Sequence, residues 1–137
     1  MTSGPVIARA GDLAAARAEF DEFVSRLREA GVTVLVAEDS EEPVKTDAVF
    51  PNNWVTFHAD GTVVTYPMLS ENRRLERDEK ILEQLKQLFA VNHRVHLETY
   101  ELEHLFLEGT GSMILDRKHR IVYACVSPRT DPQLLDL

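Results

Sequence analysis

The feature that most constrains the fold is the pair Asp60-Gly61, which lies between two β-rich runs. Residues 54–58 and 62–66 consist largely of β-branched and aromatic side chains, and only three residues separate the two runs. An Asp-Gly pair in this setting is a strong signal for a β-hairpin. We therefore predict an antiparallel hairpin over residues 54–66.

A helix and a further strand are predicted after this hairpin. Asp78 is a suitable N-cap for a helix whose apolar residues recur at helical spacing and which should end near Asn92. Residues 94–97 are then expected to form a strand. Hairpin, helix and strand together predict a ββαβ unit over residues 54–97, within an α/β (α+β) fold.

The same order of elements begins again further along the chain. A second hairpin is predicted from residues 112–115 and 121–126. Asp131 and Pro132 have the residue types of an N-cap and of a first helical position, so a helix should start there. The sequence stops at Leu137, soon after that start. We therefore expect an N-terminal portion of a longer protein, with about two such units.

The residues before the first hairpin predict a helix, a strand and a loop. Apolar residues recur at helical spacing up to Ala30, with Asp12 as the expected N-cap and Gly31 as the C-terminal stop. Residues 32–37, Val-Thr-Val-Leu-Val-Ala, are a short β-branched run that suits a strand buried on both faces. The acidic residues 38–46 are predicted to form a loop.

Irregular backbone with polar side chains is expected between this loop and the first hairpin. Pro51 and two asparagines lie within residues 47–53, and binding loops often have this composition. Asp47, Asn52 and Asn53 are therefore candidates for substrate contacts. Asparagine is also common in ordinary turns, and the pattern alone favours that simpler interpretation.

Glu108 is the other candidate from the pattern. It begins the segment Glu-Gly-Thr-Gly-Ser, which joins a predicted strand ending at Leu107 to the second hairpin. The two glycines allow tight backbone beside a carboxylate. Glycines between strands most often only form a turn, so the pattern by itself gives Glu108 no more than a candidate role.

The charge and the apolar pattern argue against two kinds of partner. The 23 acidic and 15 basic residues give a formal net charge of −8, which does not suit a surface that binds nucleic acid. Nowhere do eighteen apolar residues run together, so we expect no membrane span and no signal peptide.

The single cysteine and the histidines bear on compartment and metal binding. Cys125 has no partner for an internal disulfide, which favours a reducing compartment, with the cytoplasm as the default. It lies in an apolar run predicted as a strand, where a free cysteine acts as a small hydrophobe. The five histidines do not show the spacing of metal ligands, so no metal and no cofactor is predicted.

Two clusters of charged residues are interpreted as solvent-exposed, because charge runs usually form solvated faces. The first precedes the helix that Asp78 caps and consists of Arg73, Arg74, Glu76 and Arg77. The second follows residues 94–97 and consists of Glu98, Glu101, Glu103 and His104.

Six blocks of the sequence resemble the guanidine-modifying superfamily of arginine deiminases, dimethylarginine hydrolases and amidinotransferases, called penteins. The blocks are residues 47–55 (DAVFPNNWV), 60–64 (DGTVV), 66–68 (YPM), 72–76 (NRRLE), 107–112 (LEGTGS) and 124–131 (ACVSPRTD). Within the superfamily they are most similar to the citrulline-utilisation hydrolases. Since penteins consist of five ββαβ units, the resemblance implies part of a five-bladed α/β propeller.

The resemblance also implies roles for particular residues. Glu108 matches the glutamate that accompanies the catalytic histidine and contacts the guanidinium or ureido nitrogens of the substrate. Asn53 stands where arginine deiminases have an aspartate that grips a cationic guanidinium. A neutral amide offers both a donor and an acceptor and suits a neutral ureido group better, which favours citrulline over arginine. Ser127, Arg129 and Thr130 match a Ser-x-Arg-Thr turn, which is interpreted as mainly structural.

The catalytic groups themselves are not matched within the chain. In the superfamily a cysteine attacks the central carbon of the substrate and a histidine acts as acid and base. The resemblance places both beyond Leu137, so the chain alone is expected to be inactive.

The leading hypothesis is that the chain supplies Glu108 and the loop at Asn52 and Asn53 to a hydrolase of citrulline or a related ureido or guanidino compound. Its partner would be the remainder of the propeller or a second copy of the chain. One alternative is a non-catalytic module that pairs its exposed strand edges with itself or a partner. Another is an amidinotransferase.

Overall fold

A computed structural model describes residues 10–40 and 42–137. The chain divides into two units, with the boundary after Glu38. The first nine residues, on which the expectation about a signal peptide depends, lie outside the described residues. None of the described helices is long and apolar enough to cross a membrane.

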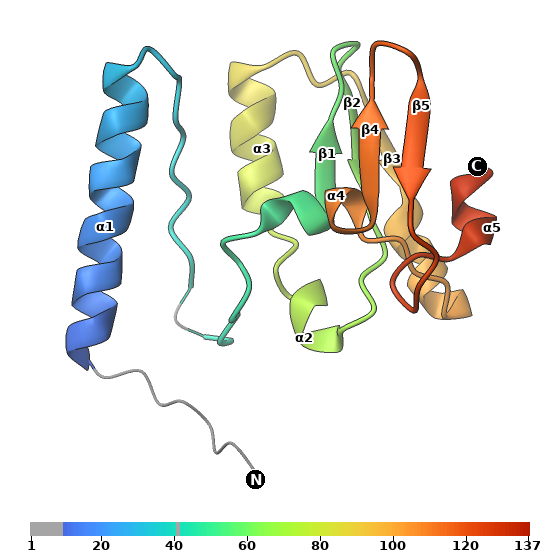
Figure 1. Ribbon diagram of the computed structural model, residues 1–137, viewed down its shortest axis with the longest axis horizontal. Helices are drawn as coiled ribbons and strands as arrows, with labels where there is room; N and C mark the ends of the chain where they lie inside the picture. The colour runs from blue at the N-terminus through green and yellow to red at the C-terminus, as the bar shows by residue number, and fades with distance from the viewer. Residues whose placement is uncertain (1–9, 41) are drawn as a thin grey trace, which may run out of the picture. The chain divides into compact units, whose positions relative to one another are not determined.

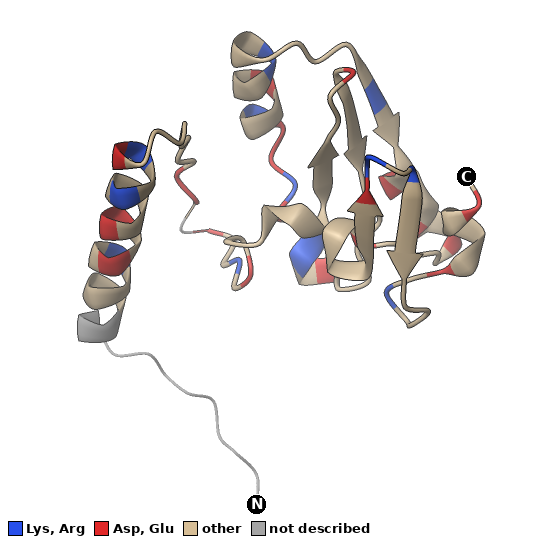
Figure 2. Ribbon diagram, turned by 45° about the horizontal axis from the view of Figure 1, so that its top comes forward, with Lys and Arg blue, Asp and Glu red and all other residues tan. Residues whose placement is uncertain are grey.

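The first unit contains one long helix, α1 (Ala10–Glu29), which carries both acidic and basic residues (Figure 2). Its C-terminal end forms a Schellman motif. The N–H of Gly31 donates to the carbonyl of Arg28, and the N–H of Val32 donates to the carbonyl of Leu27. The φ of Gly31 is +83°, a value that glycine adopts at little cost. The predicted stop at Gly31 is therefore confirmed.

Two predictions for this unit are wrong. α1 already includes Asp12, so Asp12 is not its N-cap. Residues 32–37 do not form a strand, and the side chains of Val32, Leu35 and Val36 are exposed. A strand needs partners for its backbone N–H and C=O groups, and no described strand pairs with this run. Its β-branched composition therefore marks a segment that favours pairing but has no partner here.

In the second unit the predicted hairpin is confirmed (Figure 1). β1 (Val55–Phe57) and β2 (Thr62–Thr65) pair antiparallel, and β3 (His93–His96) lies parallel to β2, which gives the order β1-β2-β3. A parallel pair requires a crossover connection, and this one contains α3 (Glu79–Leu88). The predicted ββαβ order is thus present.

Two helices lie between β2 and β3. The short α2 (Glu71–Arg74) comes first. Asp78 then caps α3 as predicted, because its carboxylate accepts the N–H of Lys80 at 2.8 Å. α3 ends at Leu88 rather than near Asn92, since the backbone is already extended at Phe89.

The second predicted hairpin is also confirmed. β4 (Met113–Asp116) and β5 (Ile121–Ala124) pair antiparallel, and the short α4 (Gly109–Ser112) precedes them. α5 (Pro132–Leu135) begins at the predicted proline, and the carboxylate of Asp131 accepts the N–H of Gln133 at 2.9 Å.

Two further predictions for this unit are wrong. No strand ends at Leu107, which forms only an isolated bridge with Thr130; the residues before it include the 3-10 helix η2 (Leu97–Glu103). Cys125 is exposed rather than buried, as are the side chains of β5. The reason is that β4 is the single strand paired with β5 among the described residues, and no residue of β5 joins the buried core.

The core consists of two apolar clusters on opposite faces of β2. Neighbouring residues of a strand point to opposite faces, and Val63 and Val64 accordingly contact different clusters. The cluster of Val63 also contains Trp54, Val55, Met68 and Leu82, the last from α3. Val64 packs against the cluster that Tyr66, Leu107, Met113 and Leu134 form. The three-stranded sheet is therefore the middle layer of this unit, between α3 and the β4–β5 hairpin with α5 (Figure 1).

The close approach of the first hairpin turn to the end of α3 gives a stability prediction. Gly61 has a φ of +85°, and a Cβ there would lie 2.5 Å from the carbonyl oxygen of Ala90. We expect Gly61→Ala to lower the free energy of unfolding by about 1–3 kcal/mol. Urea unfolding monitored by the fluorescence of Trp54, the one tryptophan of the chain, measures this.

Arg120→Gly is the matched control, because Arg120 also has a positive φ, 58°, in an exposed turn of the same unit. It should shift the free energy of unfolding by less than about 1 kcal/mol. Equal effects of the two substitutions would contradict the importance of the contact between Gly61 and Ala90.

Candidate functional site

Glu108 is the centre of the candidate site. Its side chain is only 1% exposed, and its two carboxylate oxygens have different partners. Oε1 accepts the backbone N–H of Leu69 at 3.2 Å, and Oε2 accepts the amide Nδ2 of Asn53 at 3.1 Å. Because a buried charge is costly unless it is hydrogen-bonded and paired, these donors are required for the carboxylate to remain inside the protein.

Two guanidinium groups face the same carboxylate oxygen. Nη1 of Arg129 lies 3.4 Å from Oε2 of Glu108, and Nη1 of Arg73 lies 3.9 Å from it. Arg73 is held in place by Glu76 through two hydrogen bonds of 2.9 and 3.0 Å, and its Nε lies 3.8 Å from Asp47. The hydrogen bonds to Glu76 raise the pKa of Arg73 against the opposing effect of burial, and nearby carboxylate charges add to the rise.

The sequence suggested that the first charged cluster is a solvated face, and this interpretation is wrong. The side chain of Glu76 is 1% exposed and that of Arg73 is 12% exposed. α2, which begins this cluster, presents both signs of charge close together (Figure 2). The i,i+3 spacing of an arginine and a glutamate in a helical turn was a signal for this ion pair.

The rest of this cluster supports the chain where it leaves β2. Nε of Arg74 donates to the carbonyl of Met68 at 2.8 Å, and Nη2 of Arg77 donates to Glu101 at 2.9 Å. Glu101 in turn accepts the N–H of Met68 at 2.7 Å. These bonds fix the segment that gives its next N–H, that of Leu69, to the carboxylate at the centre of the site.

The second charged cluster is also only partly exposed. Glu101 is largely buried by its bonds to Arg77 and Met68, and Glu98 by contacts with Thr65 and Arg94, whereas Glu103 and His104 are exposed. The sequence showed that these residues are acidic. Arg77, which pairs with Glu101, comes from another segment, whereas Arg94 lies four residues before Glu98. The burial of the two glutamates against Met68 and Thr65 depends on distant residues, so local sequence could not show it.

The two glycines after Glu108 allow its loop to approach the asparagines. Gly109 has a positive φ, and a Cβ there would overlap the carbonyl oxygen of Asn52; a Cβ at Gly111 would overlap the side-chain amide of Asn53. Asn52 also donates from Nδ2 to the hydroxyl of Thr110 at 3.0 Å. The tight backbone expected here is thus present, and it brings the two predicted loops together.

The Ser-x-Arg-Thr turn lies against the same loop. The N–H of Thr130 donates to the carbonyl of Ser127 at 2.9 Å, and the carbonyl of Arg129 accepts the hydroxyl of Ser112 at 2.7 Å and the N–H of Glu108 at 3.2 Å. Thr130 is buried. These bonds hold the turn against the loop of Glu108, and the side chain of Arg129 also reaches the carboxylate.

The predicted site residues thus fall into three groups. Asn53 and Arg129 contact Glu108 directly. Asn52 contacts its loop through Thr110. Asp47 is about half exposed and reaches the site only through Arg73. Neither Arg73 nor Glu76 was predicted as a site residue.

The described part of the chain also bears on the predictions for metal ligands and for Cys125. Among the side chains that the structure describes, no three of His, Cys, Asp and Glu are placed to hold a metal ion. The thiol of Cys125 is exposed and lies 3.9 Å from the carbonyl oxygen of Val126.

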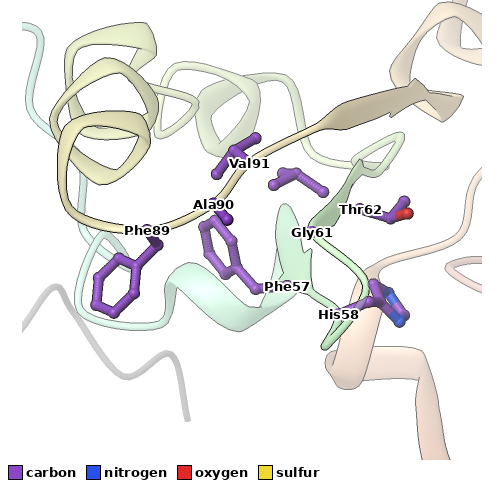
Figure 3. A pocket seen from close by; sticks show the side chains of 8 residues that line it. Phe57, His58, Gly61, Thr62, Phe89, Ala90 and Val91 are labelled. Carbon is purple, nitrogen blue, oxygen red and sulfur yellow. The ribbon is translucent and has the colours of Figure 1, made fainter.

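An apolar pocket of about 310 Å³ lies beside the first hairpin turn and contains none of the predicted site residues. Figure 3 shows Phe57 and Phe89 at this pocket, with His58 at its edge. Thr56 Oγ1 lies 3.1 Å from Nε2 of His58 and 2.9 Å from the hydroxyl of Tyr66. The pocket offers few polar groups, so it does not suit a ureido or guanidino group.

The fold and the site together define an α+β protein with a buried carboxylate that accepts N–H donors. A family model described as "N,N dimethylarginine dimethylhydrolase, eukaryotic" matches residues 9–137, nearly the whole chain. The chain therefore belongs to this family, a guanidino-modifying family of the pentein superfamily, and the superfamily expected from the sequence is confirmed. Comparison with curated proteins and with solved structures gave no significant match. The narrower similarity to citrulline hydrolases stays a prediction.

Removal of the central charge should destabilise the chain. Glu108→Gln replaces one carboxylate oxygen by an amide NH₂. The N–H of Leu69 or the amide of Asn53, which donate to the carboxylate in the wild type, then loses its acceptor. We expect a loss of about 1–3 kcal/mol in the free energy of unfolding, measured by urea titration with Trp54 fluorescence. Glu103→Gln, an exposed change of the same kind, should have almost no effect. A Glu108→Gln protein as stable as the wild type would contradict the network.

The pH dependence of stability should contain a contribution from His58. Burial, and then the charge of Arg117, lower its pKa below 6.5, while Asp60 opposes the shift. The unfolded chain then binds this proton at a higher pH than the folded chain does. The contribution of His58 to stability is therefore fully present above its unfolded pKa. It is lost as the pH falls from about 7.5 to 5.5.

His58→Gln should flatten this part of the stability profile, measured by urea unfolding at several pH values. His93→Gln, which removes an exposed histidine of the same unit, should keep the wild-type slope over this range. Identical slopes for His58→Gln and the wild type would show that His58 does not contribute.

Proposed function

We propose that this chain supplies the substrate-binding part of the active site of a hydrolase that acts on a ureido or guanidino group, with citrulline as the preferred substrate. The observation that carries the proposal is the buried pair of Asn53 and Glu108, with 3.1 Å between the amide and the carboxylate. A carboxylate accepts N–H groups, and an amide can both donate and accept. Together they offer acceptors for the N–H groups and a donor for the carbonyl oxygen of a planar ureido group.

The charge around Glu108 favours a neutral substrate. Two guanidinium groups, those of Arg73 and Arg129, already lie within 3.9 Å of its carboxylate. These positive charges would repel a cationic substrate, whereas they would not repel a neutral ureido group. With an aspartate in place of Asn53 a second negative charge would be available for a cation, and here that charge is absent.

The chemical step requires groups that the site around Glu108 does not contain. In the proposed reaction a cysteine thiolate adds to the ureido carbon, the terminal nitrogen takes a proton and leaves as ammonia, and water then releases the remaining acyl group. The thiol of Cys125 contacts the carbonyl oxygen of Val126, and none of its described contacts joins it to Glu108 or Asn53. We propose that parts of the parent protein outside these 137 residues supply the cysteine and the histidine.

The order of elements supports a partial propeller. One ββαβ unit is complete from β1 to β3, and a second hairpin with the short helix α5 follows. We propose that the remainder of the propeller is the partner of this chain. A reducing, cytoplasmic location fits the single free cysteine.

Exposed apolar residues favour a second candidate function, that of a non-catalytic module which self-associates. The hairpin β4–β5 exposes Ile114, Val122 and Tyr123, and exposed apolar strands promote association. Light scattering on the purified chain tests this.

The contacts of the site fit hydrolysis and amidino transfer equally, and hydrolysis is proposed because the matched family is named as a hydrolase.

Ligand preference tests the proposal through Asn53. We expect the wild-type chain to bind citrulline more tightly than arginine, and Asn53→Asp to shift the ratio of the two affinities towards arginine by about tenfold, the equivalent of 1.4 kcal/mol. NMR titration that monitors the side-chain amide of Asn52, which is present in both proteins, measures both affinities. Asn92→Asp, at an exposed asparagine of the same unit, is the control and should leave the ratio unchanged. An unchanged ratio in Asn53→Asp would contradict the proposed preference.

The proposed division of the active site has its own test. The purified chain should release no ammonia from citrulline, whereas the parent protein that includes the predicted cysteine and histidine should do so. Ammonia release by the chain alone would contradict the proposal and return Cys125 to consideration as the nucleophile.

A further inference from the structure

We propose that a cleft between the turns of the two hairpins binds a small organic anion, a carboxylate carried on a short apolar chain. The cleft has a volume of about 560 Å³ and is lined by none of the candidate site residues. The first turn, residues 58–61, and the second turn, residues 117–120, lie side by side (Figure 1). The proposal is independent of the function proposed above.

The cleft lies at the opposite end of both hairpins from the candidate site. Asn53 comes just before β1, and Glu108 comes just before α4 and β4. The candidate site is thus at the end of each hairpin where the chain enters, whereas the cleft is at the end where the chain reverses. A ligand in the cleft therefore occupies a second site and does not extend the first.

The second turn concentrates positive charge in a chain whose net charge is −8. Its four residues are Arg117, Lys118, His119 and Arg120, and basic residues stand out in the loop between β4 and β5 (Figure 2). The two arginines line the cleft, and His58 lines it from the first turn. Two guanidiniums and an imidazole therefore share one cavity.

The two carboxylates that line the cleft are bonded to their own turns. Oδ1 of Asp60 accepts the N–H of Thr62 at 2.9 Å. Asp116 accepts the N–H of His119 at 3.0 Å and lies 2.7 Å from its Nδ1. Among the described residues, no ion pair joins either carboxylate to an arginine of the second turn. These arginines therefore keep N–H donors for a ligand.

The two arginines are held differently. Nη1 of Arg117 donates to the carbonyl of Phe57 at 2.5 Å, which ties the second hairpin to the first. A guanidinium has five N–H donors, so this bond leaves others available. Arg120 is exposed, and its guanidinium forms no hydrogen bond within the part of the chain that the structure describes. One donor group is thus fixed beside the cleft, and the other can adapt to a ligand.

The pKa of His58 reflects the positive potential in the cleft. Burial lowers this pKa most, the charge of Arg117 lowers it further, and the charge of Asp60 opposes the shift with a smaller effect. The positive neighbour thus outweighs the negative one at this imidazole. A cleft with this balance of charge attracts an anion.

Apolar side chains form the remaining wall of the cleft. Leu115 of β4 and the pair Ile121 and Val122 of β5 line it. Ile121 is 43% exposed and Val122 is 51% exposed. Sites for small molecules combine an apolar lining with a few polar groups that orient the ligand. An alkyl chain would cover this wall and an inorganic anion would not, which favours a carboxylate on an apolar chain.

Three probes test the proposed ligand chemistry: hexanoate, its neutral amide hexanamide, and acetate. Binding to the 137-residue chain is measured at pH 7 by NMR titration of the backbone amides of the two turns. We expect hexanamide and acetate to bind at least about fivefold more weakly than hexanoate, because one lacks the charge and the other the apolar chain. Equal binding of hexanamide and hexanoate, tighter binding of inorganic phosphate, or no binding of hexanoate would overturn the proposal.

Arg120→Gln tests the cationic side of the cleft, and the side chain has no bonds whose loss would disturb the fold. We expect it to weaken hexanoate binding by about fivefold. Lys118→Gln removes the same charge from the same turn, but Lys118 does not line the cleft. This control should change the affinity by less than about twofold. Equal losses in the two variants would show a general effect of net charge and would overturn the proposal.

The titration of His58 gives a readout that does not depend on a charge substitution. Bound hexanoate should raise the pKa of His58, because an anion stabilises the imidazolium. The affinity for hexanoate then rises as the pH falls from about 7.5 to 5.5, and His58→Gln should lose this dependence. The other charged groups that line the cleft keep their charge over this range: Asp60, Asp116, Arg117 and Arg120. An unchanged pKa of His58 at saturating hexanoate would overturn the proposal.

Discussion

The burial of one carboxylate, that of Glu108, is the constraint on which the rest of the site depends. With 1% exposure it cannot be hydrated, so protein groups must supply its hydrogen bonds and its countercharge. Those groups come from four separate segments: Leu69 after β2, Asn53 before β1, Arg73 in α2, and Arg129 after β5. The carboxylate can therefore be stable only when these segments are in their final places. The site and the fold of the second unit form together.

The same requirement explains why charged residues next to the site are buried. Arg73 lies between the carboxylates of Glu76, Glu108 and Asp47, so its charge is shared among three groups. Glu76 fixes its position, and Arg73 then provides Glu108 with a permanent positive neighbour. Arg129, whose side chain is 53% exposed, provides a second one.

The sequence predicted those features that depend on neighbouring residues and missed those that depend on distant partners. Asp60-Gly61, Asp78, Asp131 and Gly31 mark turns and helix ends through local hydrogen bonds or a positive φ, and all four were predicted correctly. Residues 32–37 and Cys125 lie in apolar runs whose burial needs a partner strand, and for these the prediction was wrong. Glu108 and Asn53 were candidates from the pattern and received their roles from the resemblance, whereas Arg73 and Glu76 were dismissed because a charge cluster is normally solvated. Only their approach to a buried carboxylate from another segment gives them their role.

The substitution of an amide for a carboxylate at position 53 is consistent with every other contact of the site. Two carboxylates 3.1 Å apart would repel each other unless a cation lay between them. The amide instead donates to Glu108, and the absence of a Cβ at Gly111 leaves room for it. The guanidiniums of Arg73 and Arg129 supply positive charge beside Glu108. Under the proposed function, the amide and the carboxylate then offer directed hydrogen bonds, which a neutral ureido group can use.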